Sequence, residues 1–151
     1  MNKNKNQVLI SGAVVFKERK GKVKWFLIRQ SEDDGWEIPK VVVRKNESSV
    51  RASLRMMGEQ AGMRVRVLEE AARAGGVTTT GGHTIPQRYL YYLVYHKVDS
   101  GEIIGFDSYL WLDYLQAVKK ISSKREKKVL KQAKEELKKW KKKRQERRAS
   151  A

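Results

Sequence analysis

The charged side chains best suited to do chemistry lie on one short segment in the first half of the chain. Glu47, Arg55 and Glu59 fall within residues 47–61, where apolar residues recur at the spacing of one helix face. A carboxylate on such a helix can hold a hard cation such as Mg²⁺ through its oxygens, or it can form an ion pair with a neighbouring base. Because Glu59 follows Arg55 by four residues, the sequence alone leaves both uses open.

Other catalytic arrangements are missing from the sequence. The chain has no Cys, so disulfides, thiolate zinc sites and cysteine nucleophiles are excluded. It also has no phosphate-binding loop of Walker type, no Ser/His/Asp arrangement and no zinc-ligand spacing. Of the two His residues, His83 lies in a glycine-rich segment that could close over a substrate or be an ordinary loop, and His96 is interpreted as structural.

The helix that would carry these charges is predicted over residues 47–61. Asn46 is expected to cap it and Gly62 to end it. Its apolar face should consist of the residues spaced by three or four positions, namely Val50, Leu54, Met57 and Ala61.

The remaining elements predict a mixed α/β domain. Strands are expected where β-branched and aromatic residues gather, at residues 7–16, 23–29, 63–68, 87–98 and 109–112. Turns are expected at the glycine pairs 75–76 and 81–82. Helices should follow at residues 113–121 and 124–148, the second beginning with a capping box from Ser123 and Glu126.

The net charge of +17 is unevenly divided along the 151 residues. Residues 119–151 hold 16 of the 34 basic and 4 of the 17 acidic residues, and so carry +12. Residues 1–118 carry the remaining +5, as a mildly basic globular domain would. We therefore expect one domain over residues 1–121 and a basic helical tail over residues 122–151.

The basic part of the tail runs from Lys124 to Arg148 and has two compatible interpretations. Lysines and arginines surround Trp140, which favours RNA binding or ribosome association through phosphate contacts and base stacking. Alternatively, the tail is a solvated helix whose Leu130, Leu137 and Trp140 pack on the domain. The same apolar stripe could serve a dimer, so the oligomeric state stays open.

Two features of the sequence bear on membranes. An anionic membrane surface is a third candidate partner for the tail. No apolar run reaches ~18 residues, so no membrane-spanning helix is expected. We expect a cytoplasmic location.

Residues 41–63 resemble the signature of the Nudix hydrolase family. That signature is G-x5-E-x7-R-E-U-x-E-E-x-G-U, where U is a bulky aliphatic residue. Its spacing is kept without an insertion over these 23 positions. The matching positions include Glu47, Arg55, Glu59 and Gly62. The lead-in from Trp36 to Lys40 and the late Trp111 before a short helix are also similar, so the resemblance covers residues 7–121.

The resemblance implies an α/β fold of the Nudix type, an α/β/α sandwich with a mixed sheet, to which this chain adds a basic C-terminal helix. It implies Mg²⁺- or Mn²⁺-assisted hydrolysis of a nucleoside diphosphate linked to another group, with a nucleotide-like small molecule as ligand. The implied metal ligands are Glu47 and Glu59, the implied catalytic acids are Glu59 and Glu102, and the implied substrate-binding residues are Trp36, Lys40 and Arg55.

Three positions depart from the signature. Val41 replaces its first glycine, Met56 replaces the acid beside Arg55, and Gln60 replaces the second acid of the paired Glu residues. A thioether is a poor ligand for a hard cation, and an amide offers only a neutral oxygen. We therefore expect weak metal binding and weak or no hydrolase activity. The alternatives are an active hydrolase with a nonstandard metal shell, and an RNA-binding or ribosome-associated module acting through the tail.

Overall fold

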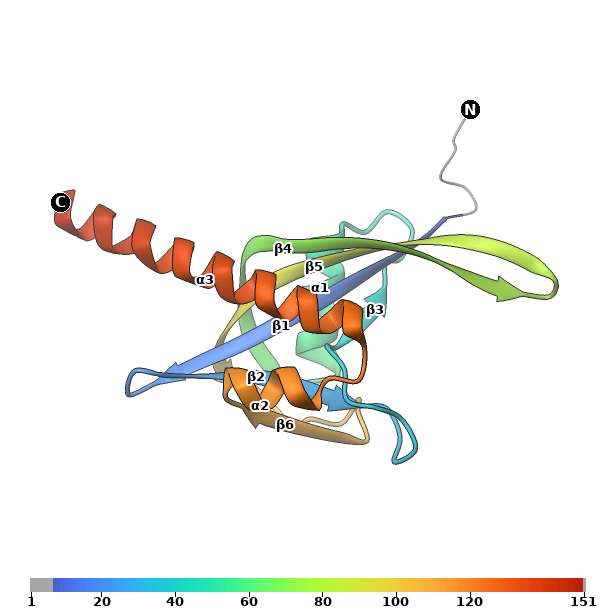
Figure 1. Ribbon diagram of the computed structural model, residues 1–151, viewed down its shortest axis with the longest axis horizontal. Helices are drawn as coiled ribbons and strands as arrows, with labels where there is room; N and C mark the ends of the chain where they lie inside the picture. The colour runs from blue at the N-terminus through green and yellow to red at the C-terminus, as the bar shows by residue number, and fades with distance from the viewer. Residues whose placement is uncertain (1–6, 151) are drawn as a thin grey trace.

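The computed structural model describes residues 7–150, and within them it has six strands and three helices (Figure 1). The strands are β1 (Val8–Arg19), β2 (Lys22–Arg29), β3 (Lys40–Val42), β4 (Met63–Thr80), β5 (His83–Asp99) and β6 (Ser108–Leu112). The helices are α1 (Ser49–Glu59), α2 (Tyr114–Lys120) and α3 (Lys124–Ser150).

The six strands form one mixed sheet. Five of them lie in the order β4-β5-β1-β2-β6, and β3 pairs with β1 alongside this path. β1 runs parallel to β5, from Val8 opposite Gln87 to Phe16 opposite Tyr95, and the other named strand pairs are antiparallel. The predicted α/β sandwich with a mixed sheet is therefore confirmed.

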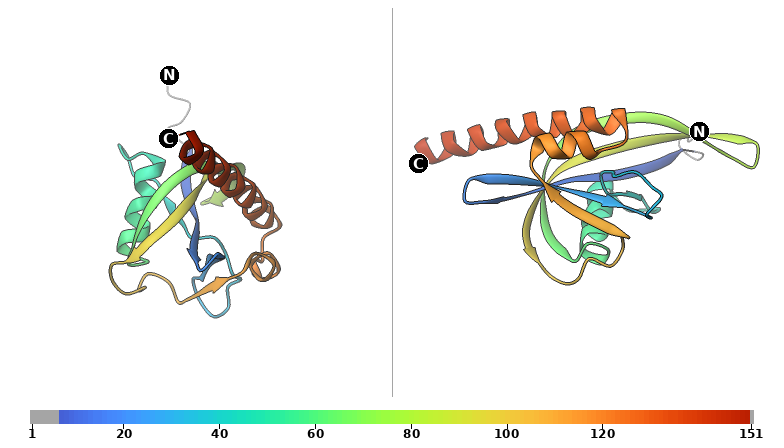
Figure 2. Two further views of the ribbon diagram at one scale, coloured as in Figure 1. Left: turned by 90° about the vertical axis from the view of Figure 1, so that its left-hand side faces the viewer. Right: turned by 60° about the horizontal axis from the view of Figure 1, so that its bottom comes forward.

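Helices cover both faces of this sheet (Figure 2). Successive residues of β1 point to opposite faces, as in any strand. Ala13 and Val15 therefore join the core under α1. Val14 and Phe16 join the core under α2 and α3. The helix α1 and the basic helix α3 therefore lie on opposite faces of the sheet, each over its own core.

The start and the buried face of α1 differ from the sequence prediction. Ser48, not Asn46, caps the helix, because the Ser48 hydroxyl accepts a hydrogen bond from the Arg51 amide. Asn46 instead adopts a positive φ of 64° in the preceding turn. Val50 and Leu54, which were expected to be buried, are 36% and 40% exposed. The buried residues of the helix are Ala52, Ser53, Met56 and Met57.

The predicted turn at residues 75–76 is also wrong. β4 continues through this glycine pair, since Gly75 and Gly76 pair with Arg88 and Gln87 across the ladder. The chain turns only at residues 81–82, where both glycines have positive φ. β4 and β5 consequently form a long ribbon whose tip projects beyond the rest of the sheet (Figure 1).

The first half of α3 belongs to the core. Its buried apolar residues pack against the sheet, and they are Val129, Leu130, Ala133 and Leu137. The second half carries most of the exposed basic residues, and its end projects beyond the rest of the molecule (Figure 1). The domain division at residue 121 stays a prediction, although the core runs across it. Within residues 7–150, no helix is both long enough and apolar enough to cross a membrane.

Candidate functional site

An ion pair fixes the turn that leads into α1. The Arg55 side chain donates from Nε to Glu47 Oε2 at 2.8 Å and from a terminal nitrogen to Glu47 Oε1 at 3.0 Å. The same terminal nitrogen donates to the Val42 carbonyl at 3.2 Å, and the Arg44 amide donates to Glu47 Oε1 at 3.1 Å. The pair therefore ties the end of β3 and the turn before α1 to the middle of the helix.

The protonation of this pair follows from these contacts. The hydrogen bonds from Arg55, and then the one from the Arg44 amide, lower the pKa of Glu47 from 4.5 to about 2. The Glu47 partner in turn raises the pKa of Arg55. Both oxygens of Glu47 already accept hydrogen bonds, so this carboxylate is engaged as a partner of Arg55 in this structure. Its role as a metal ligand stays a prediction.

Position 56, where the family signature has an acid, lies in the core under α1. The Met56 side chain is 0% exposed and belongs to the same cluster as Met57, Val15 and Phe26. An ionised carboxylate at this place would lose its hydration without gaining a partner. Methionine is thus the side chain that this packing accommodates.

Buried hydroxyl groups anchor the first half of α1 to the sheet. Ser11 on β1 donates to the Ser49 carbonyl at 2.7 Å and shares a hydrogen bond of 2.7 Å with the Ser53 hydroxyl. The Ser49 hydroxyl is also hydrogen-bonded to the Tyr92 hydroxyl on β5. Ser11 and Ser53 are fully buried, and the sequence analysis missed both because a serine carries no apolar signal.

The last turn of α1 meets the loop that carries Glu102. The amides of Ile104 and Gly105 donate to the Gln60 carbonyl, and the amides of Ser100 and Gly101 donate to the Gly62 carbonyl. These four bonds hold the loop against the end of the helix.

The loop leaves two acids at this end of α1. A Cβ built on Gly62 would lie 2.5 Å from the Glu102 carbonyl oxygen, so the backbone of Glu102 touches Gly62. Glu59 is exposed and lies three residues before Gly62. Glu59 and Glu102 therefore flank the same helix end, which is the part of the predicted site that the structure brings together.

These residues do not fit a metal that protein side chains alone would hold. Across residues 7–150 there is no group of three or more His, Cys, Asp or Glu side chains placed to share a metal ion. Glu59 supplies a carboxylate, Gln60 an amide and Met56 a buried thioether. Mg²⁺ held by one or two carboxylates takes its other ligands from water and substrate phosphates.

The other predicted substrate-binding residues lie across the sheet from Glu59. Trp36 packs against the core under α2 and α3, with the Arg29 guanidinium 4.9 Å above its ring. The Lys40 ammonium group binds Glu126 of α3 at 2.8 Å and lies 3.5 Å from Glu37. Trp36 and Lys40 thus share no site with Glu59, and their contact with a substrate stays a prediction.

Glu126 organises this second face. Its carboxylate is 2% exposed and accepts hydrogen bonds from the Ile38 amide at 3.0 Å, the Lys40 ammonium at 2.8 Å and the Tyr91 hydroxyl at 2.8 Å. Burial, followed by the charge of Glu126, raises the pKa of Tyr91. The capping box is only half present, because the Glu126 amide binds the Ser123 hydroxyl while the Glu126 carboxylate points into the core.

The two histidines lie at different places on β5. His83 is exposed at the tip of the β4–β5 ribbon, directly after the turn. His96 is buried, shares a hydrogen bond of 2.9 Å with Asp99 and packs edge-on with Trp111.

The replacement of the signature glycine by Val41 causes no backbone strain. Val41 lies in β3, pairs with Ser11 of β1 and has no positive φ.

Comparison with solved structures identifies the architecture. An Ap4A hydrolase of C. elegans, in a binary complex, superposes with a TM-score of 0.71 at 20% identity and covers 86% of this chain and 97% of its own. The Nudix domain of Shewanella oneidensis NrtR, complexed with ADP ribose, gives 0.65 at 17% identity over 88% and 90%. The chain has the Nudix fold. An E. coli dihydroneopterin triphosphate pyrophosphohydrolase gives 0.63 at 12% identity over 82% and 92%.

The resemblance noted in the sequence is thereby confirmed at the level of the Nudix fold. No protein-family model and no curated protein sequence matches the chain. In this Nudix fold, α1 occupies the segment that carries the degenerate signature, residues 41–63, and α3 covers the opposite face.

Proposed function

We propose that this Nudix-fold protein binds a nucleoside diphosphate derivative and has weak or no hydrolase activity. Proteins of the same fold include an Ap4A hydrolase, a UDP-X diphosphatase and a domain complexed with ADP ribose. These names support a ligand that joins a nucleoside to a chain of phosphates. If activity survives, pyrophosphate hydrolysis assisted by Mg²⁺ or Mn²⁺ is the reaction they support.

The observation that carries the loss of activity is the burial of Met56. Methionine has no side-chain oxygen, and this side chain packs in the core with no exposed surface. Position 56 therefore supplies no ligand for a metal. Gln60 replaces a second charge, and both oxygens of Glu47 are bound by Arg55. Glu59, assisted by Glu102, is then the principal carboxylate left to attract a metal.

The test measures binding and turnover separately. Calorimetry of the full chain with ADP-ribose, Ap4A and a UDP-sugar, with and without Mn²⁺, reports ligand binding. Phosphate or nucleotide release with the same compounds reports hydrolysis. We expect binding of at least one compound, together with turnover close to the background rate.

Single variants decide between this proposal and an active enzyme with a nonstandard metal shell. Metal-dependent turnover that Glu59→Gln abolishes, and that Glu32→Gln leaves intact, would establish the active enzyme instead. Glu32 is a suitable control because it is an exposed acid in the loop after β2. Gln60→Glu restores an acid beside Glu59 and should strengthen Mn²⁺ binding; no change in this variant would contradict the eroded-site explanation.

A further inference from the structure

A basic groove lies between the second half of α3 and the sheet, on the face opposite α1. Its volume is about 470 Å³, within the range of about 300–1,000 Å³ that ligand sites occupy. One wall consists of Arg66 on β4 with Tyr95 and Lys97 on β5. We call this feature the α3 groove.

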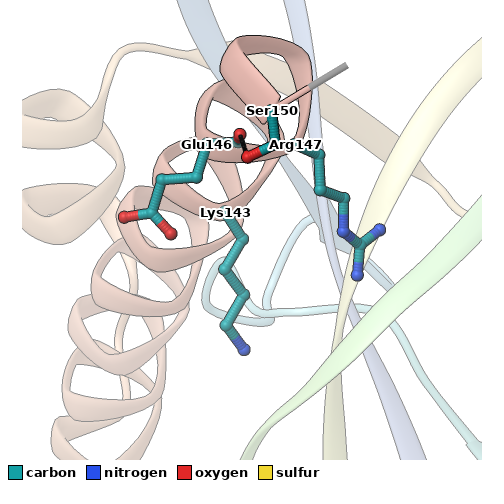
Figure 3. A pocket seen from close by; sticks show the side chains of 4 residues that line it. All are labelled: Lys143, Glu146, Arg147 and Ser150. Atoms are coloured by element: carbon teal, nitrogen blue, oxygen red, sulfur yellow. Dashed lines mark hydrogen bonds between the residues drawn. The ribbon is translucent and has the colours of Figure 1, made fainter.

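The opposite wall comes from the end of the basic helix. Trp140, Lys143, Arg144 and Arg147 line it. Figure 3 shows the end of α3, where Lys143, Glu146, Arg147 and Ser150 line one depression and the Glu146 and Arg147 side chains point apart. This depression is shallower than the groove, shares Lys143 and Arg147 with it, and adds one acid, Glu146.

The charges of the α3 groove are arranged to attract an anion. Five cationic side chains face one acid, Glu69. Within residues 7–150, none of the five lies within 4.0 Å of a carboxylate, whereas other lysines of α3, such as Lys138 and Lys139, pair with acids of their own helix. Unpaired cations that converge from two elements supply phosphate contacts and release counterions when a polyanion binds.

Two aromatic rings distinguish the groove from a merely charged surface. Tyr95 and Trp140 come from opposite walls, and each is only partly buried. The Arg144 guanidinium lies 5.3 Å from the centre of the Trp140 ring, which adds a second flat surface. Aromatic and guanidinium planes inside a basic groove are the means by which proteins stack the unpaired bases of single strands.

We propose that the α3 groove binds single-stranded nucleic acid. The strand runs between α3 and the β4–β5 ribbon, its phosphates contact the five cations, and a base stacks on Trp140. Duplexes are disfavoured because their bases are already stacked and paired. This site is independent of α1 and of the proposed nucleotide ligand, since it lies on the other face of the sheet.

The experiment is fluorescence anisotropy of the full chain with labelled U12, dT12 and a 12-base-pair duplex between 50 and 200 mM KCl. Five phosphate contacts predict a slope of log K against log salt of about −3.5, which is about a 100-fold loss of affinity over this range. The U12 and dT12 arms show whether RNA or DNA is the better source of the strand. A duplex or inorganic polyphosphate that binds as tightly as U12 would overturn the proposal.

Matched variants separate the groove from the general charge of the tail. Replacing Lys143, Arg144 and Arg147 together by Gln should weaken U12 binding by more than about 10-fold. It should also make the slope of log K against log salt less negative by about 2. The control removes the same charge from the far side of α3, in the variant K124Q/K131Q/K142Q, where all three lysines are exposed. Equal losses in the two triple variants would refute a groove.

The sheet wall and the ring are tested in the same way. The two residues changed in R66Q/K97Q lie outside the tail, and this variant should make the slope of log K against log salt less negative by ~1.4. No effect would mean that α3 binds the strand alone and would refute binding in the groove. Trp140→Leu should weaken U12 binding between about 5-fold and 150-fold, with Trp140→Phe retaining much of the affinity. If both variants bind like the unmodified chain, stacking on Trp140 is refuted. Equally tight binding to anionic vesicles, lost in the groove variants, would overturn the proposal in favour of a membrane.

Discussion

Replacement of Glu126 by Ala tests how firmly the basic helix is fixed to the Nudix fold. This carboxylate joins three parts of the molecule, since it accepts hydrogen bonds from Ile38 before β3, Lys40 in β3 and Tyr91 in β5. The variant leaves a buried amide and a buried hydroxyl without an acceptor, and it leaves Lys40 with only Glu37, 3.5 Å away.

The size of the effect follows from these three contacts. Breaking a buried ion pair costs about 3–5 kcal/mol, and each buried polar group left unpaired costs about 1–3 kcal/mol. Lys40 regains some hydration because its side chain is 17% exposed. We therefore expect Glu126→Ala to lower the free energy of unfolding by about 4 kcal/mol. For a chain of 151 residues this corresponds to a fall in Tm of about 12 °C.

Urea unfolding, followed by far-ultraviolet circular dichroism, measures this loss. Glu126→Gln keeps one acceptor and should lose about 2 kcal/mol. The control Glu135→Ala removes an exposed acid from the same helix and should change stability by less than about 0.5 kcal/mol. Because a buried ion pair can be replaced by apolar groups, the double variant Lys40→Met/Glu126→Leu should recover most of the stability. A loss below about 1.5 kcal/mol in Glu126→Ala would refute the reasoning.

Three further changes test the packing and the charges around α1. Met56→Glu buries a carboxylate without a partner and should lower the free energy of unfolding by about 3 kcal/mol or more. Met56→Leu should lower it by less than about 1.5 kcal/mol in the same urea titration. Similar losses in the two variants would mean that water reaches this side chain despite its burial. Glu47→Gln should destabilise the fold at pH 6, where Glu47 is ionised and bound by Arg55. The difference in stability from the unmodified chain should shrink between pH 4.5 and about 2. The reason is that the folded state lowers the pKa of Glu47, so the stability that this carboxylate contributes above pH 4.5 is lost as the pH falls through the window. A pH-independent difference would argue against the Arg55 contact. Gly12→Ala places a Cβ 2.5 Å from the Tyr91 ring and should lower Tm, while Gly58→Ala, with open space around its Cβ, should raise it by filling a helix position better; the opposite order of the two melting temperatures would contradict this geometry.

Element types could largely be predicted from the sequence, but the face that α1 buries could be predicted only in part. Of the four residues expected on that face, Met57 and Ala61 are buried, whereas Val50 and Leu54 are 36% and 40% exposed. Ser53 is buried instead, and its hydroxyl shares a hydrogen bond with Ser11. A buried polar contact of this kind has no signal in apolar periodicity alone.

The contacts of the site were harder to predict than its position. The signature spacing predicts a site on α1, and local spacing offered Glu59, four residues away, as one possible partner of Arg55. Arg55 instead binds Glu47, which lies before the helix and reaches it only because the turn folds back. The contact between Lys40 and Glu126 spans 86 residues and has no local signal at all. Such pairs become visible only when the sheet brings distant segments together.

The parallel pairing of β1 with β5 has a consequence for the order in which this protein can be made. Val8 finds its partner, Gln87, only after about 80 further residues have been synthesised, which takes about 4–16 s at ordinary rates of translation. The emerging N-terminal half can form the β1–β2 hairpin early, but the edge of β1 that receives β5 stays open during that interval. An apolar strand with an open edge can pair with the wrong chain. Nascent chains stalled before β5 should therefore bind chaperones more strongly than chains stalled after it.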